Sequence, residues 1–173
     1  MKSFKEFLEE EKKKSYQIYC DMDGVLVDFI DGVQQELNIS REPTQKEITT
    51  FLSTLYGSSK EFWSELDWMS DGKKLWDTLK DLNTEILTAC PDNCKLQPSV
   101  IRGKKMWCKS NLKISSGVNV TTRKGKLKFV GPKNILIDDF IKNVNNWKAK
   151  GGIGIHHRNA RATLVELKNI LLG

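Results

Sequence analysis

Five short apolar runs, each the length of a β-strand, alternate along this chain with segments of helical periodicity. The apolar runs lie at 16–20, 85–89, 117–121, 134–137 and 152–155. The helical patterns lie at about 27–38, 43–56, 59–68, 72–82, 98–112, 140–149 and 160–171. Strands that are apolar throughout, rather than at every second residue, are typical of a sheet that is buried on both faces. The pattern therefore predicts an α/β fold with five parallel strands and helices on both sides.

The interval between the first two apolar runs is much longer than a single crossover requires. About sixty residues separate these runs, and they contain three or four helices, whereas a crossover with its helix needs only about a dozen residues or slightly more. Open parallel sheets bind ligands beyond the carboxyl ends of their strands. We therefore expect residues 30–82 to form a small helical cap over that edge, with 15–29 and 83–173 forming the core. Residues 1–14 are predicted to be a charged N-terminal arm.

Two pairs of acidic residues mark the ends of two apolar runs. In CDMDG, Asp21 and Asp23 follow the first run, and in ILIDD the fourth run ends in Asp138 and Asp139. Because the carboxyl ends of parallel strands lie at one edge of a sheet, we expect the four carboxylates to lie together. Like charges this close repel each other unless a cation lies between them, and Mg²⁺ prefers a few carboxylates with water and phosphate oxygens. The sequence thus predicts Mg²⁺ as a cofactor.

These segments resemble the motifs of the haloacid-dehalogenase-like (HAD) superfamily of aspartyl-phosphate phosphohydrolases. DMDGVLVDF is similar to the first motif, EILTA with Thr88 to the second, and ILIDD to the fourth. Their order and spacing fit nearly the whole chain from Tyr16 onward. FWSELDWMSDGKKLW and GKKMW further resemble the 5′(3′)-deoxyribonucleotidase branch and its small bacterial and phage relatives. The resemblance implies a Rossmann-like HAD fold with a small cap inserted after the first strand.

The same resemblance implies a phosphomonoesterase that works through an aspartyl-phosphate. Asp21 would be the nucleophile, and Asp23 would protonate the leaving group and then deprotonate water. Thr88 and the amides after it, including that of Ala89, would hold phosphate oxygens. Nucleoside 5′-monophosphates are the first candidates for the substrate.

The resemblance also assigns the metal ligands. Asp138 would bind Mg²⁺ directly, and Asp139 would bind it directly or through water. Asp21 and the backbone carbonyl of Asp23 would complete the protein ligands.

The third motif of the family is a lysine before the last acidic strand, and three positions match it. This lysine would neutralise charge on the transferring phosphoryl group. Counting back from Asp138 without gaps favours Lys128. The order of a lysine, then an aromatic residue, then a small residue ahead of the strand favours Lys126. We select Lys126 and keep Lys128 and Lys124 as alternatives.

Two aromatic residues of the predicted cap are candidates for contact with the substrate. Phe62 and Trp63 are adjacent in a helical pattern, so their side chains point in directions about 100° apart. If one face packs the cap, the other could meet a nucleobase above the phosphate site. Ordinary core packing of both rings is the alternative.

The net charge is distributed unevenly along the chain. Residues 101–150 contain thirteen Lys or Arg and two acids, a net charge of +11 in a chain whose total is +6. A basic half indicates a phosphate-bearing partner, although lysines on solvated helix faces account for part of it. Two further functions therefore stay open: a phosphatase for nucleic-acid termini, and a non-catalytic protein that binds phosphate or nucleic acid on the same scaffold.

The sequence carries no pattern for export or for a membrane. No apolar run approaches the roughly 20 residues that span a bilayer, and the N-terminal segment lacks the apolar region of a secretory signal. The four cysteines do not form a disulfide framework, so we expect reduced thiols. These features predict a cytoplasmic protein, in the host cytoplasm if phage-encoded, with no membrane partner.

Overall fold

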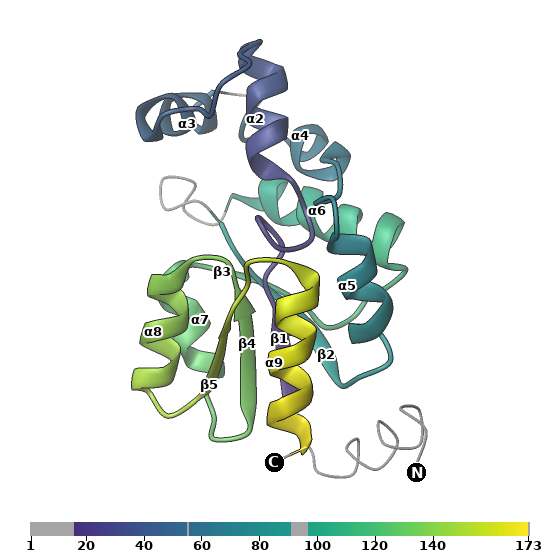
Figure 1. The fold of residues 1–173 in the computed structure, drawn as a ribbon. Helices are drawn as coiled ribbons and strands as arrows, with labels where there is room; N and C mark the ends of the chain where they lie inside the picture. Colours follow the sequence, from purple (N-terminus) through teal and green to yellow (C-terminus); the bar gives the residue numbers. More distant parts are fainter. Residues whose placement is uncertain (1–15, 55, 91–96, 173) are drawn as a thin grey trace.

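The computed structural model describes residues 16–54, 56–90 and 97–172. The arm predicted at 1–14 lies outside these residues. Five parallel strands form one sheet in the order β3-β2-β1-β4-β5 (Figure 1). The strands are β1 (Gln17–Cys20), β2 (Thr84–Ala89), β3 (Val118–Thr121), β4 (Asn134–Asp138) and β5 (Ile153–His156). The predicted fold class, a Rossmann-like α/β fold with a five-stranded parallel sheet, is confirmed.

Successive residues of the strands pack on opposite faces of the sheet, as the two-residue period of a strand requires. Ile18 and Cys20 of β1 belong to the larger core cluster, while Tyr19 between them packs with Trp147 in a smaller one. The larger cluster includes residues of α5 (Gly72–Leu79), α6 (Pro98–Trp107) and α9 (Ala160–Leu172). The smaller cluster includes α8 (Ile141–Ala149) and the 3-10 helix η3 (Leu127–Phe129). Both faces are therefore covered, which explains why the strands are apolar throughout.

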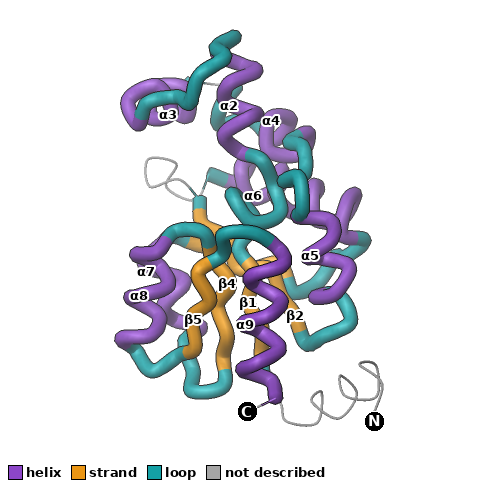
Figure 2. Tube along the Cα trace, in the orientation of Figure 1, coloured by secondary structure: helices purple, strands orange, loops and turns teal. Residues whose placement is uncertain are grey.

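Three helices stand beyond the carboxyl ends of the strands. They are α2 (Phe29–Leu37), α3 (Gln45–Leu52) and α4 (Lys60–Glu65), and Figure 2 shows them as a helical layer separate from the strands. Each begins at a residue whose side chain accepts a backbone N–H of the first turn: Asp28, Thr44 and Ser59. Such caps satisfy amides that have no partner inside the helix.

The fourth helix of the long insertion belongs to the body of the protein. Leu75 and Leu79 of α5 are fully buried, and α5 packs against α9 beside the sheet. The apolar face of α5 is buried by this contact and belongs to the main core of the protein. Of the segment predicted as cap, 30–82, only α2, α3 and α4 therefore lie over the strand ends.

The remaining helices complete the second half of the chain. A short helix α7 (Arg123–Lys126) precedes η3, and a π-helical turn η2 (Cys108–Leu112) continues α6 until Lys113, whose φ is +60°. The sequence patterns did not indicate α7 or η3. None of the described helices is both long and apolar enough to cross a membrane.

Candidate active site

The carboxyl end of β1 places Asp21 at the centre of the sheet edge. The Asp21 amide donates to the carbonyl of Ile137 at 2.8 Å, which extends the pairing of β1 with β4 by one residue. The chain then turns tightly, with the amides of Leu26 and Val27 both donating to the Met22 carbonyl at 2.9 Å. Gly24 adopts φ +73° in this turn, and a Cβ there would collide with the Asp139 carboxylate. Only glycine fits both the backbone conformation and the space.

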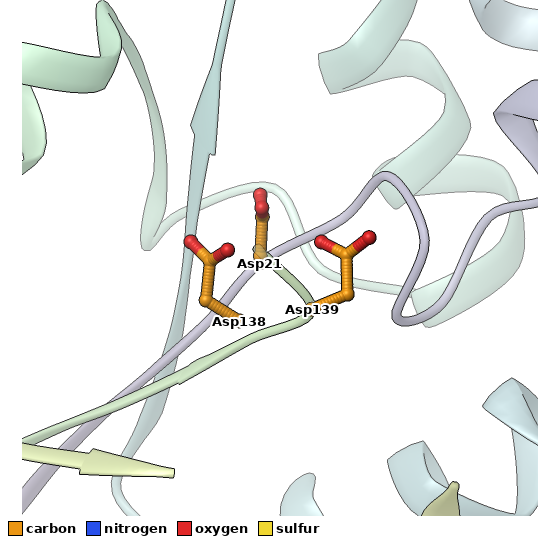
Figure 3. A group of neighbouring side chains, drawn as sticks. All are labelled: Asp21, Asp138 and Asp139. Carbon is orange, nitrogen blue, oxygen red and sulfur yellow. The ribbon is translucent and has the colours of Figure 1, made fainter. Parts of the chain in front are cut away.

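Three of the four predicted acids come together around one point. Asp21, Asp138 and Asp139 each offer a carboxylate oxygen, and these oxygens lie within 4.8 Å of one another. Figure 3 shows the three side chains projecting to the same side from the ends of β1 and β4. Asp138 is fully buried, and Asp21 is 6% exposed. The structure therefore provides hard oxygen ligands at the spacing of a divalent-cation site.

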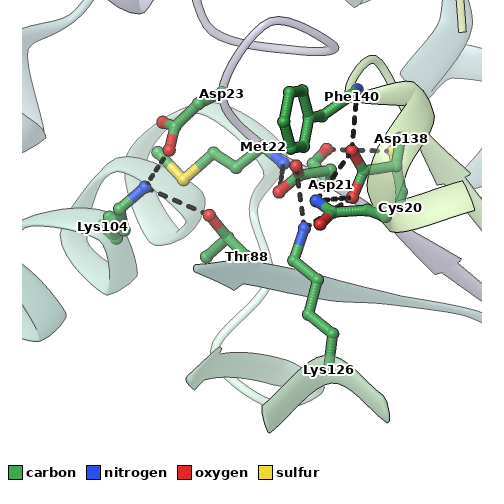
Figure 4. A network of polar contacts seen from close by, with 10 residues as sticks. Cys20, Asp21, Met22, Asp23, Thr88, Lys104, Lys126, Asp138 and Phe140 are labelled. Carbon is green, nitrogen blue, oxygen red and sulfur yellow. Dashed lines mark hydrogen bonds and ion pairs between the residues drawn. The ribbon is translucent and has the colours of Figure 1, made fainter. Parts of the chain in front are cut away.

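Among the three candidate lysines, the structure brings Lys126 into the site. Its Nζ lies 2.8 Å from Asp21 and 2.7 Å from Asp138, and the residue is 1% exposed (Figure 4). Burial alone would lower the pKa of Lys126, but the two carboxylates outweigh burial and raise this pKa. Lys124 and Lys128 are exposed. The turn of α7 points Lys126 inward, because Thr122 caps this helix and fixes its orientation.

Asn143 is a site residue that sequence reasoning missed. Its Nδ2 donates to both oxygens of Asp138, at 2.9 and 3.1 Å, and the Phe140 amide donates to the same carboxylate at 2.9 Å. Burial and the nearby Asp21 nevertheless raise the pKa of Asp138 to about 6, against the opposing effect of Lys126. The available signal was position alone, since Asn143 lies in the first turns of the helix that follows the acidic pair.

Asp139 differs from Asp138 in its surroundings. The residue as a whole is exposed, but its carboxylate faces the cavity of the site. Desolvation there raises the pKa of Asp139 to about 7, helped by repulsion from Asp21, Asp138 and Asp23. The cluster thus holds more negative charge than its lysine neutralises.

A second buried lysine, Lys104, was also missed by the sequence reasoning. Its Nζ donates to Asp23 through a short ion pair and to the Thr88 hydroxyl at 3.1 Å, and the residue is fully buried (Figure 4). The ammonium also lies 4.3 Å from the centroid of the Trp63 ring. Its segment, GKKMW, resembles a family motif but did not by itself indicate a buried lysine. Helical spacing could have identified it, because Lys104 lies on the same buried face of α6 as Val100 and Trp107.

Lys104 also contacts Thr88, the residue that we expected to hold a phosphate oxygen. The Thr88 side chain is fully buried and its hydroxyl is engaged by Lys104, while Ala89 and Cys90 line the cavity beside it. The structure therefore places Thr88 as a partner of Lys104, and it places Ala89 at the wall where we expected a phosphate-binding amide.

Asp23 presents one engaged and one unengaged oxygen. Lys104 binds Oδ2, whereas Oδ1 is buried and has no hydrogen-bond partner among the described residues. Burial raises the pKa of Asp23, and the Lys104 ammonium opposes this effect. An unpaired polar oxygen in a buried position is unfavourable unless a ligand completes it.

Phe62 and Trp63, the two predicted cap residues, are both largely buried in the cap. They are 3% and 1% exposed. The Trp63 ring stacks on Phe29 with 5.4 Å between ring centroids, and its Nε1 donates to the Gly57 carbonyl at 3.1 Å. The Phe62 ring contacts those of Phe29 and Phe51 within the cap, whereas the Trp63 ring lies over the Lys104 ammonium of α6. Trp63 also lines the cavity below the cap, so contact of its ring with a nucleobase stays a prediction; Phe62 is not among the described residues that line it.

A cavity of about 650 Å³ separates the cap from the strand ends. Its floor carries Asp21, Asp23 and Asp139, and its cap-side wall includes the apolar side chains of Phe29, Ile48 and Leu52. Arg123 and Lys126 lie at its basic side. Ligand sites for small molecules have this size and this combination of an apolar wall with a few charged groups.

The charges around the cavity suit a divalent cation. The carboxylates of Asp21, Asp23, Asp138 and Asp139 exceed the ammonium groups of Lys104 and Lys126 by two negative charges when all are ionised. Carboxylate oxygens are hard ligands, and Mg²⁺ commonly binds to one or two of them together with water and phosphate. The residues present therefore fit Mg²⁺.

Comparison with known proteins gives similarity only to solved structures. No family model matches the sequence, and no curated protein matches it significantly. The chain is similar to a hydrolase from Streptococcus pneumoniae TIGR4, with 12% identity over 91% of this chain and 99% of that one and a TM-score of 0.47. A hydrolase from Pseudomonas syringae gives 12% identity, coverage of 90% and 99%, and a TM-score of 0.46. A Had-superfamily hydrolase from Ehrlichia chaffeensis gives 10% identity, coverage of 90% and 95%, and a TM-score of 0.43. At these values no residue role is transferred from them.

Proposed function

We propose that this protein is a Mg²⁺-dependent phosphomonoesterase of the HAD type that hydrolyses nucleoside monophosphates through an aspartyl-phosphate on Asp21. The observation that carries this proposal is the different environment of two carboxylates at one cavity. Asp21 lies among the candidate metal ligands and beside Lys126, whereas Asp23 has its own lysine and a buried oxygen with no hydrogen-bond partner in the part of the chain that the structure describes. Two carboxylates with different surroundings can take different roles in one reaction.

In the first step, an Asp21 oxygen attacks phosphorus and forms the aspartyl-phosphate bond. The bond from phosphorus to the substrate oxygen breaks at the same centre, and Asp23 gives its proton to that leaving oxygen. The raised pKa of Asp23 favours the protonated form that this step needs. Lys126, next to Asp21, offsets negative charge on the transferring group.

In the second step, water attacks the same phosphorus atom. Asp23, now ionised, accepts a proton from that water, and the Asp21 carboxylate leaves as the phosphate is released. Lys104 stabilises the ionised form of Asp23 through its ion pair. The cap-side wall limits bulk water around the bond that is hydrolysed.

Mg²⁺ would be held by Asp21, Asp138 and Asp139, with the backbone carbonyl of Asp23 as a further ligand. When bound, it would neutralise charge on the phosphate oxygens and orient the group for in-line attack. Lys126 and Asn143 keep Asp138 oriented whether or not the ion is present.

The nucleoside part of the substrate is assigned from the shape of the cavity. The space above the carboxylates measures about 650 Å³ and has an apolar wall from α2 and α3. Such a wall suits a flat base or a sugar better than it suits a free phosphate. Phe29 and Trp63 are the aromatic side chains that the described part of the cap contributes to this cavity.

The test of the proposed function is the variant Asp21→Asn. An amide cannot attack phosphorus, so release of phosphate from nucleoside 5′-monophosphates with Mg²⁺ should fall by about 10⁴-fold or more. The amide oxygen can still accept from Lys126, so circular dichroism and the urea midpoint should change little. Appreciable turnover by the purified variant would exclude Asp21 as the nucleophile, and an inactive wild type across a set of phosphate monoesters would reject the phosphatase assignment.

A further inference from the structure

A second cavity adjoins the first on the side of α7 and α8. It measures about 360 Å³ and lies between these two helices, which Figure 1 shows next to each other at the side of the sheet. Four residues line both cavities: Arg123, Lys126, Phe140 and Asn143. A ligand held at Asp21 could therefore extend directly into the second cavity.

The side chains around the second cavity are basic. Arg123, Lys124, Lys126 and Lys142 line it, and none of its lining residues in the described ranges is acidic. Lys126 is already neutralised by Asp21 and Asp138. Lys124 and Lys142 are exposed, and neither makes an ion pair within the described part of the chain. Asn146 adds a side-chain amide that can donate to an oxygen. These groups together favour an anion with several oxygen acceptors.

An aromatic ring lies where the two cavities meet. Phe140 is 41% exposed, and the Arg123 guanidinium lies 5.0 Å from the centroid of its ring. An exposed ring beside basic groups is a common arrangement where proteins bind nucleic-acid strands, because the ring stacks on a base and the cations bind the backbone. The junction therefore suits a nucleotide unit between two phosphate groups.

We propose that the second cavity binds a further phosphate of the substrate, one joined through a nucleoside to the phosphate held at Asp21. This inference rests on the proposed function, since it takes the first cavity as the place of the reacting phosphate. The preferred substrates then carry a second phosphate group. Either a nucleoside 3′,5′-bisphosphate or the phosphorylated 5′ end of an oligonucleotide supplies that chemistry.

The test measures binding rather than turnover. In the Asp21→Asn background, calorimetric titration compares deoxyadenosine 5′-monophosphate, deoxyadenosine 3′,5′-bisphosphate and a 5′-phosphorylated dinucleotide, all with Mg²⁺. The second phosphate should tighten binding by about tenfold, the effect of one charge-assisted hydrogen-bonded contact. The added substitutions Lys124→Gln and Lys142→Gln should remove this gain and leave binding of the monophosphate unchanged.

A matched control removes two positive charges from lysines that do not line the second cavity. Lys148→Gln with Lys150→Gln changes two exposed lysines, in the last turn and at the C-cap of α8, that are not among the residues lining the cavity, and it should preserve the tenfold gain. An equal loss for both pairs of substitutions, or no gain from the second phosphate, would overturn the proposal. A gain with the dinucleotide alone would identify the phosphodiester as the ligand, and a gain with both would identify any second phosphate. Because no turnover is needed, an inactive wild type would reject the proposed function without removing this binding result.

Discussion

Lys104 and Lys126 are both buried beside carboxylates, but they hold different ones. Lys126 lies between Asp21 and Asp138, whereas Lys104 binds Asp23 and the Thr88 hydroxyl. A buried ammonium is stable only when its partners compensate for the water it has lost. The separation gives the proposed general acid its own counter-ion, so the charge on Asp23 can change while Asp21 remains paired.

The variant Lys104→Met tests this division. Methionine fills a similar volume without the charge, so we expect Asp23 to lose its orientation and kcat to fall by about 10²-fold. The matched control is Lys105→Met, which changes the adjacent and exposed lysine of the same helix. Steady-state kinetics with a nucleoside monophosphate, together with urea unfolding, measures both effects. If both variants kept wild-type kcat, Lys104 would have only a packing role.

At the scale of elements, the contact of α4 with α6 connects the cap to the site. Gly103 lies at this contact, and a Cβ there would be 2.5 Å from the Lys60 carbonyl oxygen and 2.7 Å from the Trp63 Cβ. Because Gly103 has no side chain, α4 approaches α6 closely there, and the Trp63 ring packs over the Lys104 ammonium. The cap and the general acid are therefore positioned by one packing contact.

We predict that Gly103→Ala destabilises the protein, although alanine is the better helix former. The gain in helix propensity is about 1 kcal/mol, and the overpacking against backbone costs about 1–3 kcal/mol. The expected net result is a lower urea midpoint, with Lys105→Ala on the exposed face as the control. If the Gly103→Ala variant were more stable than the wild type, α4 and α6 could separate slightly without a cost in stability.

At the scale of the whole molecule, the excess of acidic charge at the strand ends couples folding to the cation. Asp138 and Asp139 have raised pKa values because burial and mutual repulsion disfavour their ionised forms. A cation that binds only the folded state adds RT ln(1 + [L]/Kd) to the free energy of unfolding. The acids come from strands far apart in the sequence, so the unfolded chain has no equivalent site.

Mg²⁺ should therefore raise the melting temperature of the wild type. At a hundredfold excess over Kd the gain is about 2.7 kcal/mol, which differential scanning calorimetry resolves. The variant Asp139→Asn should lose most of this gain, because it removes a ligand from an exposed position and leaves the core unchanged. Asp81→Asn, which changes an exposed acid away from the cavity, is the control and should keep the gain. Equal melting temperatures of the wild type with Mg²⁺ and with chelator would contradict the metal assignment.

The sequence determined the strands, most of the helices and the meeting of Asp21 with the pair Asp138 and Asp139. These features depend on local periodicity and on one property of parallel sheets: the carboxyl ends of all strands lie at the same edge. Asp21 and Asp138 could therefore be brought together without knowledge of the strand order. Two sequence arguments favoured different lysines, Lys126 and Lys128, and the burial of Lys126 beside Asp21 is a result of the tertiary structure.

Tertiary structure alone decided which helix faces meet. Lys104 and Asp23 are 81 residues apart, and the ion pair between them follows from how α6 packs against α4 and the strand ends. The same packing leaves Trp63 only 1% exposed, at a position where it lines the cavity together with Phe29. The placement of α5 beside α9 and the basic cavity between α7 and α8 are further consequences of packing. A helical pattern specifies that one face will be buried, but the partner of that face is set by contacts between distant segments.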